Sequence, residues 1–202
     1  MDTLTNAIIS EMDEQMARAM LVHQLLGTRI SETLTIEQDS IRKNMRGKDV
    51  VDIYQIKTHK KYTKILNDDV LRLLRKSIDY TNDKYGKRKY VFVNSNIPDE
   101  PMQYDRIRDE LRRVIIKNDL RDDHLERFGV GTHIMRHTYA RKLTELHVDD
   151  VTIAKLLGQS GLSSLKYYRQ IRPEKLYKET KPVLDEINEE MSKILEEWNG
   201  EE

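Results

Sequence analysis

Two histidines and an arginine stand close together in the stretch HIMRHTYA, residues 133–140. Thr132 precedes this stretch, and threonine commonly caps the N-terminus of a helix. If a helix begins here, His133 and Arg136 are three residues apart and share a face near its N-terminus. An imidazole, a guanidinium and the unpaired N–H groups of a helix start together favour an anion, and a phosphate in particular.

Three other segments carry side chains suited to phosphate chemistry. Arg29 follows a helical run, Lys57 lies at the edge of a basic stretch, and Tyr168 closes the run LLGQSGLSSLKYY, residues 156–168. Arginines hold phosphate oxygens in a fixed fork, a lysine can protonate a leaving oxygen, and a tyrosine can attack phosphorus. Together with His133, these residues form a set that can cut a phosphodiester without a metal.

The tyrosine sets the main energetic demand. Its phenol has a pKa near 10, so forming the phenolate at neutral pH costs about 4 kcal/mol. A nearby base and cationic surroundings must offset that cost, and the same cations stabilise the charge that develops on the phosphate oxygens.

Each residue also has an ordinary interpretation when it is taken alone. Arg29 could be a surface salt-bridge residue, Lys57 a solvated turn residue and His133 a hydrogen-bonding residue at a helix start. His133 and His137 have metal-ligand spacing, but zinc peptidases place Glu after the first His, and Ile134 stands here, so we expect no metal. We expect His137 to pack or hydrogen-bond within the fold.

Tyr167 and Tyr168 compete for the nucleophile position. Neighbouring helix positions point about 100° apart, so only one of the two can face a phosphate. The spacing from LLGQ favours Tyr168 and leaves Tyr167 for packing.

Length and composition fit one domain of ordinary to large size. The chain has 202 residues and no cysteine, which excludes disulfides, Cys-ligated zinc and a thiol nucleophile. No apolar run is long enough to cross a bilayer, and the acidic N-terminus is unlike a secretory signal. These features are compatible with the cytoplasm, where we expect the protein to act.

The net charge of zero hides an uneven distribution. Residues 183–202 hold eight acidic residues and one lysine, which leaves a body of 34 basic and 27 acidic residues, with a charge of +7. A basic body with an acidic end suggests a polyanion-binding domain, although a solvated acidic helix is the simpler interpretation.

Hydrophobic periodicity predicts a mainly α-helical domain with one small antiparallel β-sheet, an α+β fold. Residues 50–66 alternate and carry the basic KTHKK between two β-prone runs, so they predict a hairpin with a basic turn. YVFV, residues 90–93, is a short strand or extended run. Helices are expected over residues 5–26, from Ser31, from Asn67 to Ile78, over 103–117, 133–147, from Asp149 or Asp150 to Gly158, within 162–171, and after Pro173.

The cations around the predicted hairpin are candidate DNA contacts, because proteins bind DNA mainly through its phosphates. They are Arg42, Lys43, Arg46, Lys48, Lys60, Lys61 and Lys64.

Four stretches, in this order and spacing, resemble the catalytic domain of tyrosine recombinases, the phage-integrase-like site-specific DNA recombinases. They are LLGTRISE (25–32), IKTHKK (56–61), HIMRHTYA (133–140) and LLGQSGLSSLKYY (156–168), and the resemblance covers nearly the whole chain. Each motif is weak alone, but their order on the expected elements is specific.

The resemblance implies a role for each catalytic residue. Tyr168 forms a 3′-phosphotyrosyl link, Arg29 and Arg136 hold the non-bridging oxygens, Lys57 protonates the 5′-oxygen, and His133 assists proton transfer at the tyrosine. The family usually has His or Trp where this chain has Gln159. Glutamine can donate a hydrogen bond to phosphate but cannot shuttle a proton near neutral pH.

The resemblance also implies the organisation and partners. We expect a catalytic domain over residues 1–182 and an acidic amphipathic helix over 183–202, which can pack in cis or be exchanged between protomers. The family's N-terminal core-binding domain is expected to be absent from this chain. The expected partner is duplex DNA with a specific site, with no cofactor. The alternatives are a catalytically weak DNA-binding relative and a type IB topoisomerase-like nicking enzyme.

Overall fold

The computed structural model describes residues 2–56, 58–121, 125–129, 131–146, 148–159 and 173–200. Its helices in chain order begin with α1 (Asp2–Glu11), α2 (Glu14–Leu26), α3 (Ile30–Leu34) and α4 (Asp68–Tyr85). They continue with α5 (Tyr104–Lys117), α6 (His133–Glu145), α7 (Asp150–Leu156) and α9 (Pro173–Gly200). The mainly helical α+β fold that the sequence predicts is confirmed.

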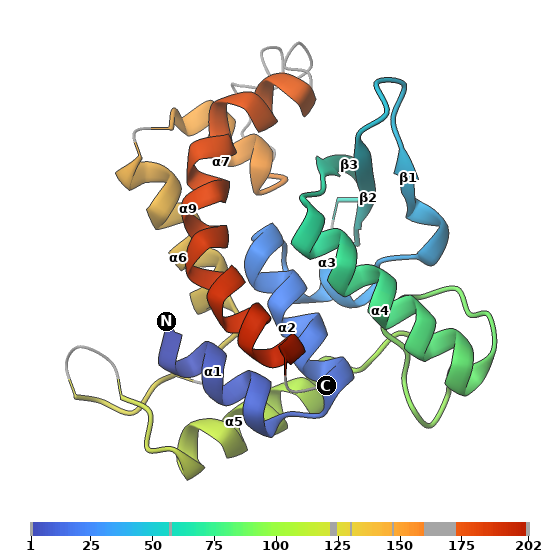
Figure 1. Ribbon diagram of the computed structural model, residues 1–202, viewed down its shortest axis with the longest axis vertical. Coiled ribbons are helices and arrows are strands. Elements are labelled where there is room, and N and C mark those ends of the chain that lie inside the picture. Colours follow the sequence, from blue (N-terminus) through green and yellow to red (C-terminus); the bar gives the residue numbers. More distant parts are fainter. Residues whose placement is uncertain are drawn as a thin grey trace.

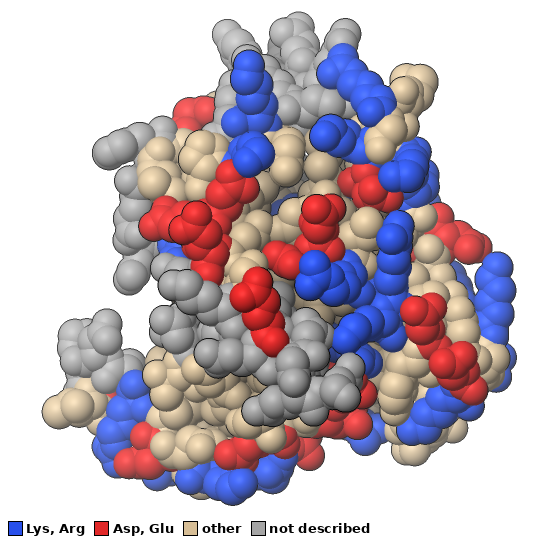
Figure 2. Space-filling model, viewed as in Figure 1, with Lys and Arg blue, Asp and Glu red and all other residues tan. Residues whose placement is uncertain are grey.

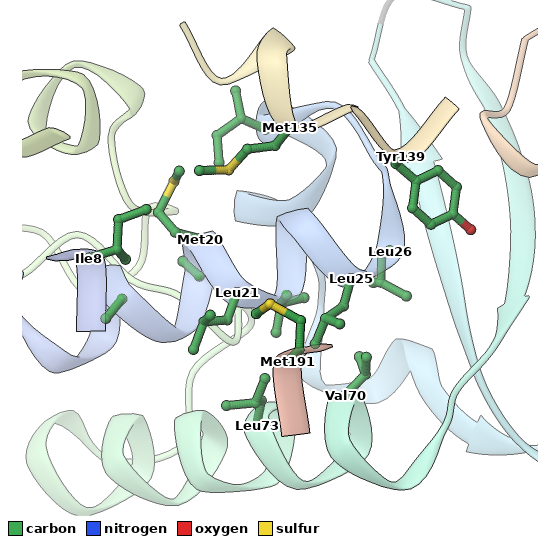
Figure 3. Packing of buried hydrophobic residues seen from close by; sticks show 14 of the residues in the cluster. Ile8, Met20, Leu21, Leu25, Leu26, Val70, Leu73, Met135, Tyr139 and Met191 are labelled. Atoms are coloured by element: carbon green, nitrogen blue, oxygen red, sulfur yellow. The ribbon is translucent and has the colours of Figure 1, made fainter. Parts of the chain in front are cut away.

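Helix α2 lies in the centre of the molecule, with α4 and the sheet on one side and α6, α7 and α9 on the other (Figure 1). It packs against α1, α3, α4, α6 and α9. Figure 3 shows Met20 and Leu21 of α2 between Met135 of α6 and Leu73 of α4. This central position explains why every residue of α2 after Glu14 is buried, polar side chains such as Arg18 and His23 included.

The first helical run is divided in two, contrary to the single helix expected over residues 5–26. Asp13 causes the division, because its carboxylate accepts hydrogen bonds from the backbone N–H groups of Gln15 (3.1 Å) and Met16 (3.3 Å). The chain therefore ends α1 and begins α2 with an N-cap at Asp13.

The sheet contains three antiparallel strands in the order β1-β2-β3. Strands β2 (Asp49–Gln55) and β3 (Lys60–Ile65) form the expected hairpin, in which Ile53 is paired with Tyr62. Strand β1 (Ile41–Lys43) pairs with β2 and was not expected, because three residues are too few to show alternation. Residues 90–93 do not form a regular strand, because Tyr90 and Val93 make isolated bridges and residues 91–92 are bends.

Helix α9 is continuous through Pro182, so the expected boundary at residue 183 falls inside one helix. The helix packs against α1, α2, α6 and β3 of its own chain. Val183, Ile187 and Met191 are at most 3% exposed and belong to the main hydrophobic core. In this structure the acidic helix is therefore docked in cis.

Candidate active site

A buried carboxylate, Glu32 of α3, lies where several distant segments meet. Its side chain is 2% exposed. One oxygen, Oε1, accepts hydrogen bonds from Arg29 Nη1 (2.6 Å) and Gln55 Nε2 (3.3 Å), and the other, Oε2, accepts from the Arg29 backbone N–H (2.9 Å) and the Tyr62 hydroxyl (3.0 Å). A buried charge needs partners of this kind to offset its lost hydration.

Arg29 stands immediately before α3 and binds Glu32 through both its backbone and its guanidinium. The short connection from the end of α2 allows this close contact. The Arg29 side chain is still 32% exposed, so it reaches from the buried carboxylate to the surface. Arg29 can therefore present N–H donors to a bound anion.

Arg136 comes from α6 and lies on the other side of Glu32. Its Nη1 donates to the Gly27 carbonyl (3.0 Å) and lies 4.0 Å from Glu32 Oε2, and its Nη2 donates to the Leu157 carbonyl (2.5 Å). Burial and the nearby Arg29 lower the pKa of Arg136, although arginine stays charged at physiological pH. Arg136 thus ties the ends of α2 and α7 together.

Gly27 makes the approach of α6 possible. It ends α2 in the left-handed region, with φ of 61°. A Cβ atom at this position would lie 2.4 Å from the Tyr139 ring, so a larger residue would push α6 away. The glycine therefore sets the distance at which Arg136 can reach the Gly27 carbonyl.

His133 opens α6 and is exposed. Thr132, the residue before His133, is hydrogen-bonded to a buried histidine, His23 of α2. The distance between His23 Nε2 and the Thr132 carbonyl oxygen is 2.9 Å. Burial lowers the pKa of His23 to about 4, so the ring is neutral at physiological pH. His137 is exposed on the same helix. Of the two expectations for it, packing or hydrogen bonding within the fold, packing is therefore wrong.

Gln159 follows the turn that ends α7, and its side chain is exposed. The backbone carbonyls of the two residues before it accept hydrogen bonds from side chains of the site. The Leu157 carbonyl accepts from Arg136, and the Gly158 carbonyl accepts from Gln55 Nε2 (2.6 Å). The structure therefore places Arg29, Arg136 and the backbone before Gln159 around Glu32. Lys57, Tyr168 and the competing Tyr167 lie outside the described residues.

The candidate DNA contacts divide into two kinds. Arg42 and Lys43 pair with Asp52 and Asp49 at 2.8 and 2.9 Å. The other exposed members are Arg46, Lys48, Lys60 and Lys61. Figure 2 shows Lys and Arg side chains projecting from the sheet and interspersed with Asp and Glu.

Lys64 differs from the others because it is buried, so its grouping with surface cations is wrong. It is 6% exposed, it donates to the Leu26 carbonyl, and its ammonium nitrogen lies 5.2 Å from the centre of the Tyr139 ring. Burial lowers the pKa of Lys64 to about 7. The residue points into the core from the inward face of β3 and has no access to a DNA backbone.

Two arginines and one carboxylate leave this cluster with a net charge of +1. A phosphodiester carries one negative charge and presents two non-bridging oxygens that match guanidinium donors. Within the described residues no three His, Asp or Glu side chains come together as a metal site. The charge and the donors of the arrangement therefore fit a singly charged phosphate.

The order of these motifs and their meeting point agree with a match to the Phage integrase family over residues 1–175. The chain belongs to the phage integrase family. The chain is 22% identical over 174 residues to transposase B of transposon Tn554 from Staphylococcus aureus, covering 86% of this chain. Transposase B of transposon PsiTn554 from the same organism is also 22% identical. The chain spans 27% of the length of these relatives.

Solved structures share the fold of this integrase-family chain. The XerH site-specific recombinase bound to difH substrate has a TM-score of 0.62 at 18% identity, covering 86% of this chain and 49% of that one. A lambda integrase dimer bound to a COC′ core site has a TM-score of 0.57 at 18% identity, covering 85% of this chain and 58% of that one.

No helix within the described ranges has both the length and the apolar character to cross a bilayer.

Four residues of the site were not predicted as site residues from the sequence. Glu32 lies inside LLGTRISE, three residues after Arg29, and that spacing was a usable signal for a pair. Gln55 shares the inward face of β2 with Val51 and Ile53, so its burial could be expected from the alternation. The contacts of Tyr62 and His23 join segments far apart in the chain, and nothing in the local sequence indicates them.

Proposed function

We propose that this integrase-family domain breaks and rejoins duplex DNA at a specific site, in the cytoplasm, through a 3′-phosphotyrosyl intermediate. The oxygen of Tyr168 forms a bond to phosphorus while the bond to the 5′-oxygen breaks, and that oxygen takes a proton from Lys57. His133 assists removal of the phenol proton. The reverse attack by a 5′-hydroxyl reseals the strand, so the bond energy is conserved.

The meeting of Arg29 and Arg136 at Glu32 supports this proposal most strongly. The two guanidiniums come from segments more than 100 residues apart, and Glu32 lies within 2.6 Å of one and 4.0 Å of the other. Donors fixed before the reaction stabilise developing oxyanion charge without reorganisation. This is the requirement of a phosphoryl transfer that uses no metal.

Gln159 is the departure from the usual family pattern. The side chain is exposed, and the backbone before it is fixed by hydrogen bonds to the carbonyls of Leu157 and Gly158. This position suits a neutral hydrogen-bond donor to a phosphate oxygen. In this proposal it contributes a hydrogen bond and no proton transfer.

The exposed cations of the sheet supply the DNA contacts. Arg42, Lys43, Arg46, Lys48, Lys60 and Lys61 are exposed, and Arg42 and Lys43 also pair with aspartates. The XerH and lambda integrase structures are complexes with DNA, which supports a DNA partner for this chain.

Self-association on DNA through α9 is part of this proposal. The helix docks in cis, and a cavity of about 270 Å³ lies between its Leu184 and Tyr177 and the residues of β3. Exchange of this helix onto a neighbouring protomer would link assembly to activity. Lambda integrase, one of the neighbours, forms a tetramer on a Holliday junction.

Covalent trapping tests the proposal. The protein is incubated with a pool of nicked duplexes that are randomised around the nick, and adducts are recovered on a denaturing gel and sequenced. We expect an adduct with a preferred DNA sequence that disappears in Tyr168→Phe. An adduct that survives Tyr168→Phe and disappears in Tyr167→Phe would assign the nucleophile to Tyr167.

Gln159 also favours a second candidate, a catalytically weak relative that binds recombination sites. Salt-dependent binding of a preferred sequence with no adduct at any time would support that function instead. Relaxation of a supercoiled plasmid of arbitrary sequence would indicate a topoisomerase-like activity.

A further inference from the structure

The side-chain amide of Gln55 joins three parts of the site. It stands at the end of β2, two residues before Lys57, and is 4% exposed. Its Oε1 accepts from the hydroxyl of Thr58 (2.9 Å), the residue after Lys57, and its Nε2 donates to the Gly158 carbonyl (2.6 Å) and to Glu32 Oε1 (3.3 Å). One amide therefore links the hairpin turn, the end of α7 and the buried carboxylate.

Tyr62 makes the second link from the hairpin. It lies on β3 opposite Ile53, and its hydroxyl donates to Glu32 Oε2 at 3.0 Å. Burial and the nearby Glu32 carboxylate raise the pKa of Tyr62, so the phenol keeps its proton and remains a donor. Both strands that flank the Lys57 turn are thus bonded to the carboxylate that also holds Arg29.

Gly158 shows how closely the turn after α7 lies against these two side chains. It has a φ of 61°, and a Cβ atom there would fall 2.5 Å from Gln55 Nε2 and 2.8 Å from Tyr62 Cε1. No side chain fits between them, so the backbone before Gln159 rests directly on the hairpin.

We propose that Gln55 and Tyr62 are positioning residues that fix the Lys57 turn relative to the arginine pair and the turn before Gln159. Neither residue contacts DNA in this proposal. They act on the hairpin segment that carries Lys57, so this inference rests on the proposed function and on Lys57 as the proton donor.

Replacement of the leaving oxygen tests this role. In a duplex whose scissile 5′-bridging oxygen is sulfur, the leaving group is a thiol with a pKa near 8.5, which departs as the anion without a proton from Lys57. A defect that acts through Lys57 should therefore disappear on the sulfur substrate, whereas a general loss of structure should remain on both.

Single-turnover cleavage rates are compared for Tyr62→Phe and Gln55→Met, with Tyr80→Phe on α4 as the matched loss of a hydroxyl. We expect each positioning variant to lose about 10-fold on the oxygen substrate and less than about 3-fold on the sulfur substrate. Tyr80→Phe should be unchanged on both. We also expect Lys57→Ala/Tyr62→Phe to be no slower than Lys57→Ala on the oxygen substrate. Equal losses on both substrates, or an additive double variant, would overturn the inference.

Amide hydrogen exchange separates this inference from the proposed function, because it needs no cleavage. If Gln55 joins the two turns, Gln55→Met should accelerate exchange at Thr58 and at residues 158–159 together. Acceleration confined to β2 would overturn the inference even in an active enzyme. Joint acceleration in a protein that forms no adduct would support the link and refute only the proposed function.

Discussion

The two sets of cations in this molecule differ in how firmly they are held. Arg29 and Arg136 surround the buried Glu32 and are bound to fixed carboxylate and carbonyl oxygens. Lys60 and Lys61 lie exposed on β3. Fixed donors suit a transition state, whereas mobile surface charges suit long-range attraction to a phosphate backbone.

Strand β3 shows how sharply the two environments are separated. Lys61 is exposed, and Lys64, three residues further along the strand, is 6% exposed and bonded to the Leu26 carbonyl. Position on the strand, and not residue type, decides whether a lysine can contact DNA. The following variants test this division, from the largest expected effect to the smallest.

Loss of the central charge should have the largest effect. In Glu32→Gln, Arg29 and Arg136 lose their shared counter-charge, so we expect cleavage about 100-fold slower and an unfolding free energy lower by about 3 kcal/mol. Urea unfolding and single-turnover cleavage measure the two effects. The control is Glu37→Gln, because Glu37 is 46% exposed and pairs with Lys89 at the surface, and its removal should cost under about 1 kcal/mol. Equal costs for the two variants would contradict the central role of Glu32.

Acid should weaken the start of α6 through His23. The folded-state pKa of His23 is about 4 against an ordinary 6.5, so its contribution is complete above pH 6.5 and is lost as the pH falls towards 4. The expected loss of unfolding free energy is about 3 kcal/mol, measured by urea unfolding across this range. His23→Gln should flatten the dependence and the exposed His137→Gln should not. A slope that persists in His23→Gln would assign the effect to other groups.

Removal of the buried lysine should stabilise the fold. The charged form of Lys64 is penalised, since its folded-state pKa is about 7 against 10.5, and the penalty is relieved only as the pH rises from 7 to 10.5. We expect Lys64→Met to raise the unfolding free energy at pH 7 by about 2 kcal/mol. Its DNA-binding salt slope should match that of the unmodified chain, and a reduced slope would return Lys64 to the interface.

Loss of the exposed Lys60 and Lys61 should weaken DNA binding without changing the stability of the fold. In Lys60→Ala/Lys61→Ala we expect a salt slope smaller by about 2 and a stability change within about 0.5 kcal/mol. Fluorescence anisotropy at several salt concentrations measures the slope. An unchanged slope would remove both lysines from the DNA interface.

Much of the fold could be predicted from the sequence because its signals are local. Alternation in residues 50–66 predicts the β2–β3 hairpin. The sequence also predicts helices that start at Asn67 and at Asp149 or Asp150, and the side chains of Asn67 and Asp149 are the caps. The division between α1 and α2 was missed because apolar spacing continues through Met12 while Asp13 caps the second helix. Periodicity reports burial, and it does not show where the backbone turns.

The candidate site was only partly predictable. The resemblance named Arg29 and Arg136, but the carboxylate between them was not named as a site residue. The same strand alternation that buries Gln55 also turns Tyr62 and Lys64 inward, so a list of basic residues near the hairpin mixes two environments. Contacts such as His23 with Thr132, 109 residues apart, depend on helix packing that no local pattern encodes.

The most direct test of the separate roles of the buried arginines and the exposed lysines compares two variants. Cleavage is measured at saturating DNA, and binding is measured separately. Arg136→Lys keeps the charge but loses the forked contact with the Gly27 and Leu157 carbonyls. We expect it to cleave about 100-fold more slowly with a Kd within about 3-fold of the unmodified chain. Lys60→Ala/Lys61→Ala should show the reverse, with weaker binding and an unchanged rate on saturated DNA. If both variants change the rate and the Kd by the same factors, the buried arginine and the exposed lysines do not have separate roles.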